Sequence, residues 1–275
     1  MSDWVLVTGG ATRLGREISL AFAKAGWNLI CHYRNSEEKA QSLCQEVISF
    51  GVFAQALYAE LENEDSCLGL YKQASEVSNH RLACIVNSAS LFIPDNAHDF
   101  EEHQALQQLS VNLMAPMRFG KWLYESRLNK ATNSGLDATT GSSVPKHSPS
   151  IVHILDQKVF NLNPDYFTYT VSKLALERIV SLQAQSFGPS LRVNAVSPGL
   201  IYPSGPQDLE NFKIASNANL MGIPIDPKQV AQSVLFLAQN PCITGTTIKV
   251  DNGQHLVPTP RDIMFVVDQL KQNNK

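Results

Sequence analysis

The alternation of short apolar runs with longer amphipathic segments most constrains how this chain can fold. Seven apolar runs have the length of buried strands, at residues 4–7, 28–32, 53–58, 82–86, 150–155, 191–196 and 247–250. Helical spacing of apolar residues occurs between them, at residues 16–25, 37–50, 65–77, 100–128 and 169–187. Strands that alternate with such helices predict an α/β protein, a doubly wound parallel sheet with helices on both faces.

The length and composition agree with one domain of this class. The chain has 275 residues, and 44% of them are hydrophobic, which is enough for a large buried core. We therefore expect a single domain over residues 1–275. Residues 129–149 interrupt the alternation, because they are rich in Ser, Thr, Gly, Asn and Pro and have no periodicity. We expect a mobile surface insertion there rather than a domain linker.

Charge and cysteine content argue against several other classes of protein. The net charge is −3, from 22 basic and 25 acidic residues, which gives no general attraction to nucleic acid or to a membrane. The five cysteines are widely spaced and include no C-x-x-C pair, so we expect buried, inert thiols and no metal site. An apolar run begins at Trp4, leaving no room for a signal peptide, and none is long enough to span a bilayer. We expect a cytoplasmic protein.

A glycine-rich turn, Thr8 to Gly15, follows the first predicted strand and leads into a helix. Such a unit offers backbone N–H groups and the positive end of a helix dipole to a pyrophosphate. Gly9, Leu14 and Gly15 form the backbone of the expected site, and the Arg13 guanidinium is suited to an adenosine phosphate. The alternative is a plain turn before a helix, but the position after the first strand favours a dinucleotide. The fold expected is therefore a Rossmann fold.

The end of the second predicted strand favours NADP(H) over NAD(H). An NAD-specific site normally has an acidic residue here, which holds the ribose 2′-hydroxyl. This chain instead has cations and donors suited to a 2′-phosphate, namely His32, Arg34 and Ser36. Tyr33 and Asn35 lie between them and are also candidates to contact the cofactor. Glu37 and Glu38 follow, and we assign them to the first turn of a helix, where acidic residues are favoured.

Tyr169 and Lys173 are four residues apart on a predicted helix and so share one face. A cation beside a phenol lowers the phenol pKa from about 10, which favours proton transfer near neutral pH. Lys173 is also a candidate to hold the nicotinamide ribose. Such a pair is common by chance, but here it follows a strand in a chain that begins with a dinucleotide loop. The pair therefore predicts hydride-transfer chemistry.

Two further polar segments fit a cofactor crevice. Asn87, Ala89 and Ser90 follow the fourth predicted strand, and the carboxyl ends of parallel strands line such a crevice. Asn112 lies in an otherwise apolar helix, where a buried amide must find partners. Asn112 either makes a structural hydrogen bond or kinks the helix and holds a water molecule beside Lys173.

Together these residues resemble the short-chain dehydrogenase/reductase family. The resemblance extends over residues 4–253 and includes Pro198 and Gly199, which in that family lie under the nicotinamide. It implies a catalytic tetrad, mapped here to Asn112, Tyr169 and Lys173. The fourth member of the tetrad is usually a serine thirteen residues before the tyrosine. The resemblance also suggests that the protein is a homotetramer.

Asp156 occupies the position of that serine. An ionised carboxylate only accepts hydrogen bonds, so it suits a substrate rich in N–H donors. Pteridine reductases, a branch of the same family, carry Asp at this position, Arg in the glycine loop and a basic His-Tyr segment after the second strand. They also carry Asn-x-Ala-Ser-x-Phe after the fourth strand, which Asn87, Ala89, Ser90 and Phe92 match. The chain thus resembles this branch.

The resemblance implies reduction of a dihydropterin, or of a dihydrofolate or oxidised pterin, by NADPH. Tyr169, assisted by Lys173 and Asp156, would supply the proton, and the substrate contacts would be Ser90, Phe92, Asp156 and Tyr169. Phe92 would stack on the pterin, whose flat ring suits an aromatic face. Residues 200–221 should form the substrate-side loop, with Tyr202 as a candidate lining residue.

Alternatives exist for single residues and for the whole chain. Phe92 is alternatively a core or loop aromatic, and Asp156 a solvated loop acid or a partner of Lys158. The chain as a whole is alternatively a short-chain reductase of another carbonyl substrate, or a non-catalytic protein that senses NADP(H). Asp156 argues against the first, and the combination of Asn112, Tyr169 and Lys173 argues against the second.

Overall fold

The computed structural model describes residues 2–133, 148–205 and 207–267. Within these residues seven strands form one sheet, in the order β3-β2-β1-β4-β5-β6-β7. Every neighbouring pair of strands is parallel. The strands are β1 (Trp4–Thr8), β2 (Asn28–Tyr33), β3 (Ala54–Tyr58), β4 (Leu82–Asn87), β5 (Ser150–Ile154), β6 (Arg192–Pro198) and β7 (Thr247–Val250). The predicted doubly wound parallel sheet is confirmed.

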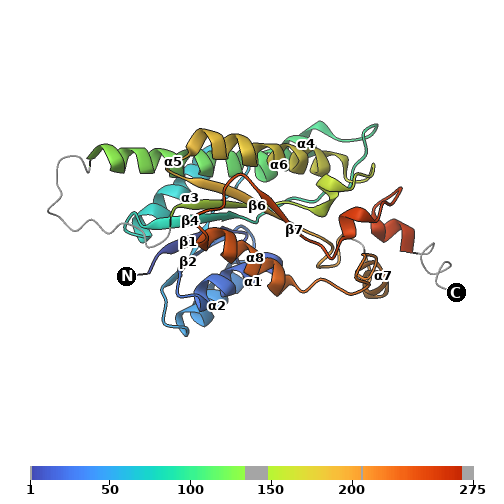
Figure 1. Ribbon diagram of the computed structural model, residues 1–275, viewed down its shortest axis with the longest axis horizontal. Coiled ribbons are helices and arrows are strands. Elements are labelled where there is room, and N and C mark those ends of the chain that lie inside the picture. The colour runs from blue at the N-terminus through green and yellow to red at the C-terminus, as the bar shows by residue number, and fades with distance from the viewer. Residues whose placement is uncertain (1, 134–147, 206, 268–275) are drawn as a thin grey trace.

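Helices cover both faces of this sheet (Figure 1). One face carries α1 (Arg13–Lys24), α2 (Glu37–Ile48) and α8 (Pro227–Gln239). The other face carries α3 (Glu64–Val77), α4 (Glu102–Leu109), α5 (Ala115–Asn133) and α6 (Phe167–Phe187). The short α7 (Leu209–Ala215) lies beyond the sheet, near the C-terminal segment. The sheet is therefore the middle of three layers.

Each face of the sheet has its own apolar core, as β1 shows. Val5 and Val7 pack in the core beneath α1, α2 and α8, whereas Leu6 packs in the core beneath α3 and α5. Successive side chains of a strand point to opposite faces, so a strand covered on both sides must be apolar throughout. This is why the strands read as continuous apolar runs in the sequence.

The helix predicted at residues 100–128 is not one regular helix. It consists of α4, one π-helical turn η1 (Ser110–Met114) and α5, which runs on to Asn133. Asn112 lies in the π-helical turn, where the regular α-helical hydrogen-bond pattern is interrupted. The helices α7 and α8 were not predicted.

The structure differs from the predicted insertion at residues 129–149 at the start of the segment. Residues 129–133 form the end of α5 rather than a loop, and residues 134–147 lie outside the described residues. Four of the cysteines are buried, but Cys242 is exposed, so the prediction of five buried thiols is wrong for this residue. It follows α8 directly, in a turn at the surface that has no apolar periodicity to indicate burial.

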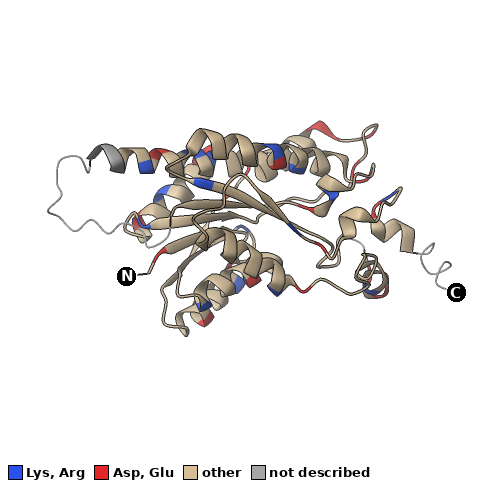
Figure 2. Cartoon of the chain, in the orientation of Figure 1, with Lys and Arg blue, Asp and Glu red and all other residues tan. Residues whose placement is uncertain are grey.

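Lys and Arg are interspersed with Asp and Glu along the helices in the view of Figure 2. None of the helices in the described residues is both long enough and apolar enough to cross a membrane.

Candidate active site

A cleft of about 640 Å³ lies over the carboxyl ends of the central strands. Its walls are the segments that follow β1, β2, β4, β5 and β6, together with residues 262–264 near the C-terminus. Most of the predicted site residues line it, namely Gly9, Arg13, Leu14, Gly15, His32, Tyr33, Arg34, Asn35, Ser36, Ala89, Ser90, Phe92, Asp156, Tyr169, Lys173, Pro198 and Gly199. Asn87 and Asn112 do not line the cleft but lie behind its wall.

The glycine-rich turn forms one end of the cleft. Gly9 has φ +63°, and a Cβ added at Gly15 would lie 2.1 Å from the Gly9 carbonyl oxygen. Helix α1 therefore begins directly against the turn, which only glycine allows. Thr12, the N-cap residue, makes no side-chain capping hydrogen bond, so it does not cover the first N–H groups of the helix. This end of the cleft suits a pyrophosphate.

His32 supports the turn instead of providing a cation. Its Nδ1 accepts a hydrogen bond from the Gly9 N–H at 3.0 Å, and its Nε2 lies 3.1 Å from the Ala59 carbonyl oxygen. Burial lowers the pKa of His32 to about 4, so the ring is neutral at pH 7. The prediction of a charged His32 on a 2′-phosphate is therefore wrong, because both ring nitrogens are engaged by backbone.

The two arginines predicted at this end make different contacts. Arg34 forms ion pairs with Glu60 at 3.2 Å and with Glu62 at 3.1 Å. Arg13 donates a hydrogen bond to the Pro203 carbonyl at 3.0 Å, and its guanidinium carbon lies 5.1 Å from the centre of the Tyr202 ring. Arg13 thus connects the glycine-rich turn to the predicted substrate-side loop, and Tyr202 enters the cleft as predicted.

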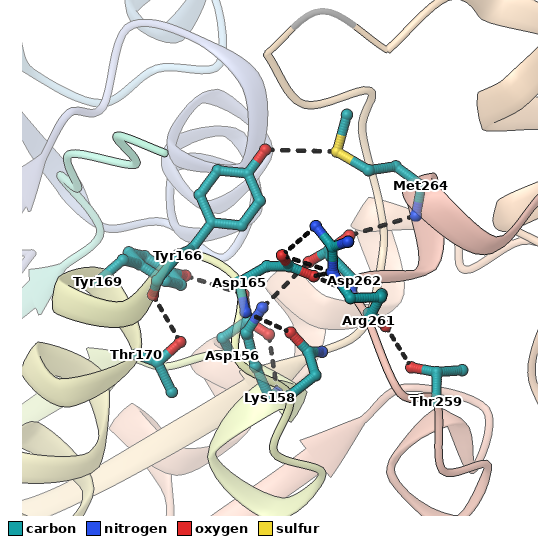
Figure 3. A network of polar contacts seen from close by, with 11 residues as sticks. Asp156, Lys158, Asp165, Tyr166, Tyr169, Thr170, Thr259, Arg261, Asp262 and Met264 are labelled. Carbon is teal, nitrogen blue, oxygen red and sulfur yellow. Dashed lines mark hydrogen bonds and ion pairs between the residues drawn. The ribbon is translucent and has the colours of Figure 1, made fainter. Parts of the chain in front are cut away.

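Tyr169 and Lys173 lie on the cleft side of α6. The Tyr169 hydroxyl donates a hydrogen bond to Asp156 Oδ2 at 2.8 Å (Figure 3). Lys173 Nζ donates to the Ile154 carbonyl at 2.8 Å and lies 5.7 Å from the centre of the Tyr169 ring. The second carboxylate oxygen of Asp156 accepts the Lys158 N–H at 2.8 Å. The structure therefore unites these groups, and Asp156 is not a solvated loop acid.

The pKa of Tyr169 is shifted in the direction opposite to the prediction. Burial raises its pKa well above 10, and the Asp156 carboxylate raises it further. Burial also raises the pKa of Asp156 and lowers the pKa of Lys173 to about 8. The expected lowering of the Tyr169 pKa by Lys173 is wrong for this state, because a carboxylate lies nearer to the hydroxyl than the ammonium does. Tyr169 is therefore protonated at neutral pH.

Asn112 clamps the loop that follows β4. Its side-chain oxygen accepts the Leu91 N–H at 2.8 Å, and its amide donates to the Leu91 carbonyl at 2.9 Å. The same amide donates to Ser172 Oγ at 3.1 Å, and Ser90 Oγ donates to the side-chain oxygen at 3.2 Å. Asn87, at the end of β4, contacts the neighbouring strand β5, because its amide nitrogen lies 3.2 Å from His153 Nδ1. Both Asn side chains hold the framework of the site.

Phe92 lies among aromatic neighbours at the other end of the cleft. It stacks on Tyr166 with ring centres 3.8 Å apart and an interplanar angle of 18°. It also meets Tyr169 edge to face at 4.6 Å. Phe92 is only partly buried and lines the cleft, so it is not an ordinary core aromatic.

Comparison with known proteins identifies the family. A family model described as Enoyl-(Acyl carrier protein) reductase matches residues 9–255. The chain belongs to this short-chain dehydrogenase/reductase family. It is similar to a dihydromonapterin reductase of Citrobacter koseri, with 24% identity over 254 residues that cover 92% of this chain and 96% of the relative.

Other similar proteins carry related names. A dihydromonapterin reductase of Escherichia coli O6:K15:H31 is 26% identical over 256 residues, which cover 92% of this chain and 96% of the relative. Among solved structures, FolM alternative dihydrofolate reductase 1 from Brucella canis, complexed with NADP, superimposes with a TM-score of 0.79 and 29% identity. This match covers 92% of this chain and 94% of that one. The chain is therefore an oxidoreductase of the short-chain dehydrogenase/reductase family.

The sequence analysis named Lys158 only as an alternative partner of Asp156, and it missed Tyr166, Asp262 and Met264 of this short-chain dehydrogenase/reductase. Lys158, Asp262 and Met264 line the cleft close to Asp156, and Tyr166 contacts Lys158 and Met264 (Figure 3). Lys158 stands two residues after Asp156, so proximity in sequence was a usable signal. Asp262 and Met264 had none, because more than a hundred residues separate them from Asp156 and no motif surrounds them.

Proposed function

We propose that this chain is an NADPH-dependent reductase of pterins, with a dihydropterin as the first candidate and dihydrofolate or an oxidised pterin as related ones. The observation that carries the proposal is Asp156, a partly buried carboxylate hydrogen-bonded to Tyr169 at the proposed substrate end of the cleft. A pterin offers an amino group and ring N–H groups, which a carboxylate accepts. The dihydromonapterin reductases and the NADP complex of FolM among the similar proteins support it.

The glycine-rich end of the cleft fits NADP(H). The space beside Gly9 and Gly15 is closed to any larger side chain, as a close approach to a pyrophosphate requires. Arg13 and Arg34, with Tyr33, Asn35 and Ser36, would hold the adenosine phosphates, since guanidinium groups bind phosphate well. Leu14, Ala89, Pro198, Gly199 and Lys173 would hold the rest of the molecule, the last at the nicotinamide ribose. When bound, NADPH supplies the hydride.

Proton supply falls to Tyr169. Reduction of a dihydropterin at a C=N bond needs a proton at the nitrogen as well as a hydride at the carbon. The Tyr169 hydroxyl is protonated at neutral pH, because its pKa is raised well above 10 by burial and by Asp156. Lys173, with Nζ 5.7 Å from the phenol ring, would stabilise the phenolate as the proton leaves Oη. Asn112, whose amide is fully used by Leu91, Ser90 and Ser172, would hold the loop after β4 against α6 and so keep the site in shape.

Asp156 and Phe92 would orient the substrate. The carboxylate would accept hydrogen bonds from the amino edge of the pterin, and its bond from Tyr169 would keep the proton donor in place. Phe92 would stack on the pterin ring, and Ser90 would hydrogen-bond to the pterin or the cofactor. Tyr166 covers one face of Phe92 and so fixes the plane of that ring.

NADPH consumption by the purified protein tests the proposal. We would follow the loss of NADPH absorbance on addition of 7,8-dihydromonapterin, 7,8-dihydrobiopterin or dihydrofolate, with a panel of simple ketones beside them. The proposal expects rapid oxidation that depends on the pterin and is slower with NADH. Turnover of ketones alone would exclude the pterin assignment but keep the chemistry of Tyr169 and Lys173. The absence of turnover with any substrate would favour an NADP(H)-sensing protein.

We also propose a homotetrameric protein of the cytoplasm. The family resemblance supports this assembly, in which the long helices of each copy would pack together. Light scattering on the purified protein would give its molar mass directly. A mass of one subunit would reject the assembly.

A further inference from the structure

An ion pair between a buried lysine and a partly exposed aspartate lies near Asp156, and its two residues are far apart in the chain. Lys158 Nζ lies 3.2 Å from Asp262 Oδ2, and only 3% of the Lys158 side chain is exposed (Figure 3). Lys158 belongs to the 3₁₀ turn η3 (Gln157–Phe160) after β5, whereas Asp262 belongs to the C-terminal segment. A buried ammonium costs free energy unless a partner is held in place.

The position of Asp262 is fixed by its own segment. Its backbone N–H donates to Asp165 Oδ2 at 2.7 Å, and its other carboxylate oxygen, Oδ1, accepts a hydrogen bond from the Met264 N–H at 3.3 Å. Arg261 Nε lies 2.8 Å from both carboxylate oxygens of Asp165. These contacts attach the C-terminal segment to the loop before α6, so Asp262 faces Lys158 before any substrate enters.

The ion pair also adjoins the groups assigned to the chemistry. The Lys158 N–H donates to Asp156, and the Lys158 ammonium lies 5.3 Å from the centre of the Tyr166 ring, which stacks on Phe92. Four charged or titratable groups face Asp156: Tyr169 and Lys173 of α6, Lys158 of η3 and Asp262 of the C-terminal segment. Three more lie further from it, namely Asp165, Tyr166 and Arg261.

We propose that Lys158 and Asp262 are a pair of positioning residues that balances the charge around the Asp156–Tyr169 hydrogen bond. The inference rests on the proposed function. In that function Asp156 receives the pterin as a carboxylate, and the pair would keep Asp156 in this charge state. Neither residue transfers a proton or an electron. The C-terminal segment is thereby part of the active site, although it contains none of the family motifs.

The direction of the effect follows from the charges. Burial raises the pKa of Asp156, the Lys158 ammonium lowers it, and the Asp262 carboxylate raises it. With Asp262 neutralised, the ammonium would be unbalanced and would lower the pKa of Asp156. With Lys158 neutralised, the carboxylate of Asp262 would be unbalanced and would raise it. With both neutralised, the two changes should cancel.

The test uses Asp262→Asn, Lys158→Met and the double variant, with Arg178→Met as the control. Arg178 is a cation of α6 whose side chain is 84% exposed, so it lies outside the site. The titration of the Asp156 carboxyl carbon is followed by ¹³C NMR and assigned by its loss in Asp156→Asn. The pH profile of kcat/KM with 7,8-dihydromonapterin is measured on the same proteins.

We expect the midpoint of the Asp156 titration to fall by about one pH unit in Asp262→Asn and to rise by a similar amount in Lys158→Met. The double variant and Arg178→Met should titrate like the wild type. The acidic limb of the pH profile should move in the same directions. A merely structural pair would reduce activity without opposite shifts of the midpoint.

Shifts of the same sign in both single variants, or no shift in either, would overturn the inference. If one single variant does not fold, a wild-type midpoint in the double variant together with the expected shift in the other supports the inference, and any other combination rejects it. Failure of the proposed function looks different. In that case the wild type would not turn over pterins, whereas the NMR midpoints would still move in opposite directions.

Discussion

The two ends of the cleft are built in different ways. The cofactor end consists of segments that directly follow strands β1 and β2, and its key contact joins Gly9 to His32, 23 residues apart. The substrate end joins residues 156–166 to residues 261–264, and its contacts span 96 to 104 positions of the chain. The first end is therefore a product of one strand–turn–helix unit and its neighbour, whereas the second forms only when distant segments pack.

This difference separates robust from adjustable parts of the site. A backbone cradle such as the turn at Gly9 depends on conformation, and few substitutions preserve it. The substrate end is made of side chains, with Asp156 in place of the usual serine and a C-terminal segment attached by Asp165. Substrate class can therefore change at this end while the cofactor end stays constant.

The largest effect should come from Tyr169→Phe, which removes the hydroxyl that we propose as the proton donor. We expect the turnover number with 7,8-dihydromonapterin to fall by a factor of about 10² to 10⁴, the usual share of general acid catalysis. NADPH affinity, measured by fluorescence titration, should stay the same, because the hydroxyl contacts Asp156 rather than the glycine-rich turn. A variant with normal turnover would show that the proton comes from elsewhere.

The next effect should come from Asp156→Asn, which keeps the shape but removes the charge. Hydrogen bonds to charged groups contribute about 1.5–3 kcal/mol, so kcat/KM for the pterin should fall by a factor of about 10 to 100. Asp65→Asn is a matched control, because Asp65 is exposed in the first turn of α3. An unchanged kcat/KM in Asp156→Asn would remove the carboxylate from substrate binding.

Arg34→Ala should have a smaller effect, and it should weaken the binding of the cofactor rather than that of the pterin. The KM for NADPH should rise by a factor of about 10, since the charge-assisted bond that we propose to the 2′-phosphate would be lost, whereas the KM for NADH should not change. Lys39→Ala is the control, because Lys39 is an exposed cation on the adjacent helix α2. Equal changes for NADPH and NADH would mean that Arg34, which pairs with Glu60 and Glu62, acts only on the fold.

The sequence predicted the sheet and the glycine-rich turn because both depend on local patterns. Apolar runs covered on two faces predicted the strands, and the spacing of Gly9 and Gly15 predicted a tight turn between a strand and a helix. The charge on His32 was misjudged, since a histidine at a strand end looks the same whether it faces a ligand or accepts a backbone N–H. Burial decides between these, and burial depends on segments elsewhere in the chain.

The substrate end was predicted only where a motif was available. Asp156, Tyr169 and Lys173 stood out through their spacing, and the structure places them together. The direction of the Tyr169 pKa was wrong because the spacing to Lys173 was known and the hydrogen bond to Asp156 was not. Asp262 had no signal at all, since nothing in the sequence indicates which turn the C-terminal segment packs against.

A modest effect on substrate affinity should come from Phe92→Leu. Aromatic pairs contribute about 0.5–1.5 kcal/mol beyond the area they bury, so the KM for the pterin should rise by a factor of about 2 to 10. The KM for NADPH should stay constant, which distinguishes a stacking role from damage to the fold. Phe187→Leu is a control, because Phe187 stacks on Tyr124 far along α6 from the cleft. A pterin KM equal in both variants would assign Phe92 to packing against Tyr166.

The smallest effect should appear in stability at acidic pH and tests the supporting role of His32. Burial lowers the pKa of His32 to about 4 in the folded chain, from an ordinary value of 6.5. Between these two values the unfolded chain binds a proton that the folded chain refuses, so the free energy of unfolding falls as the pH falls. At pH 5 this one residue should cost about 2 kcal/mol relative to pH 7.

His32→Asn keeps an acceptor for the Gly9 N–H but cannot take up a proton. Urea unfolding at pH 7 and at pH 5 should therefore show a smaller loss of stability for this variant than for the wild type. His98→Asn, at an exposed position, should behave like the wild type. Because His153 has a pKa of about 4 as well, some loss will remain in His32→Asn. An equal loss of stability in the wild type and in His32→Asn would mean that His32 is protonated in the folded chain. His32 would then be a cation beneath the glycine-rich turn.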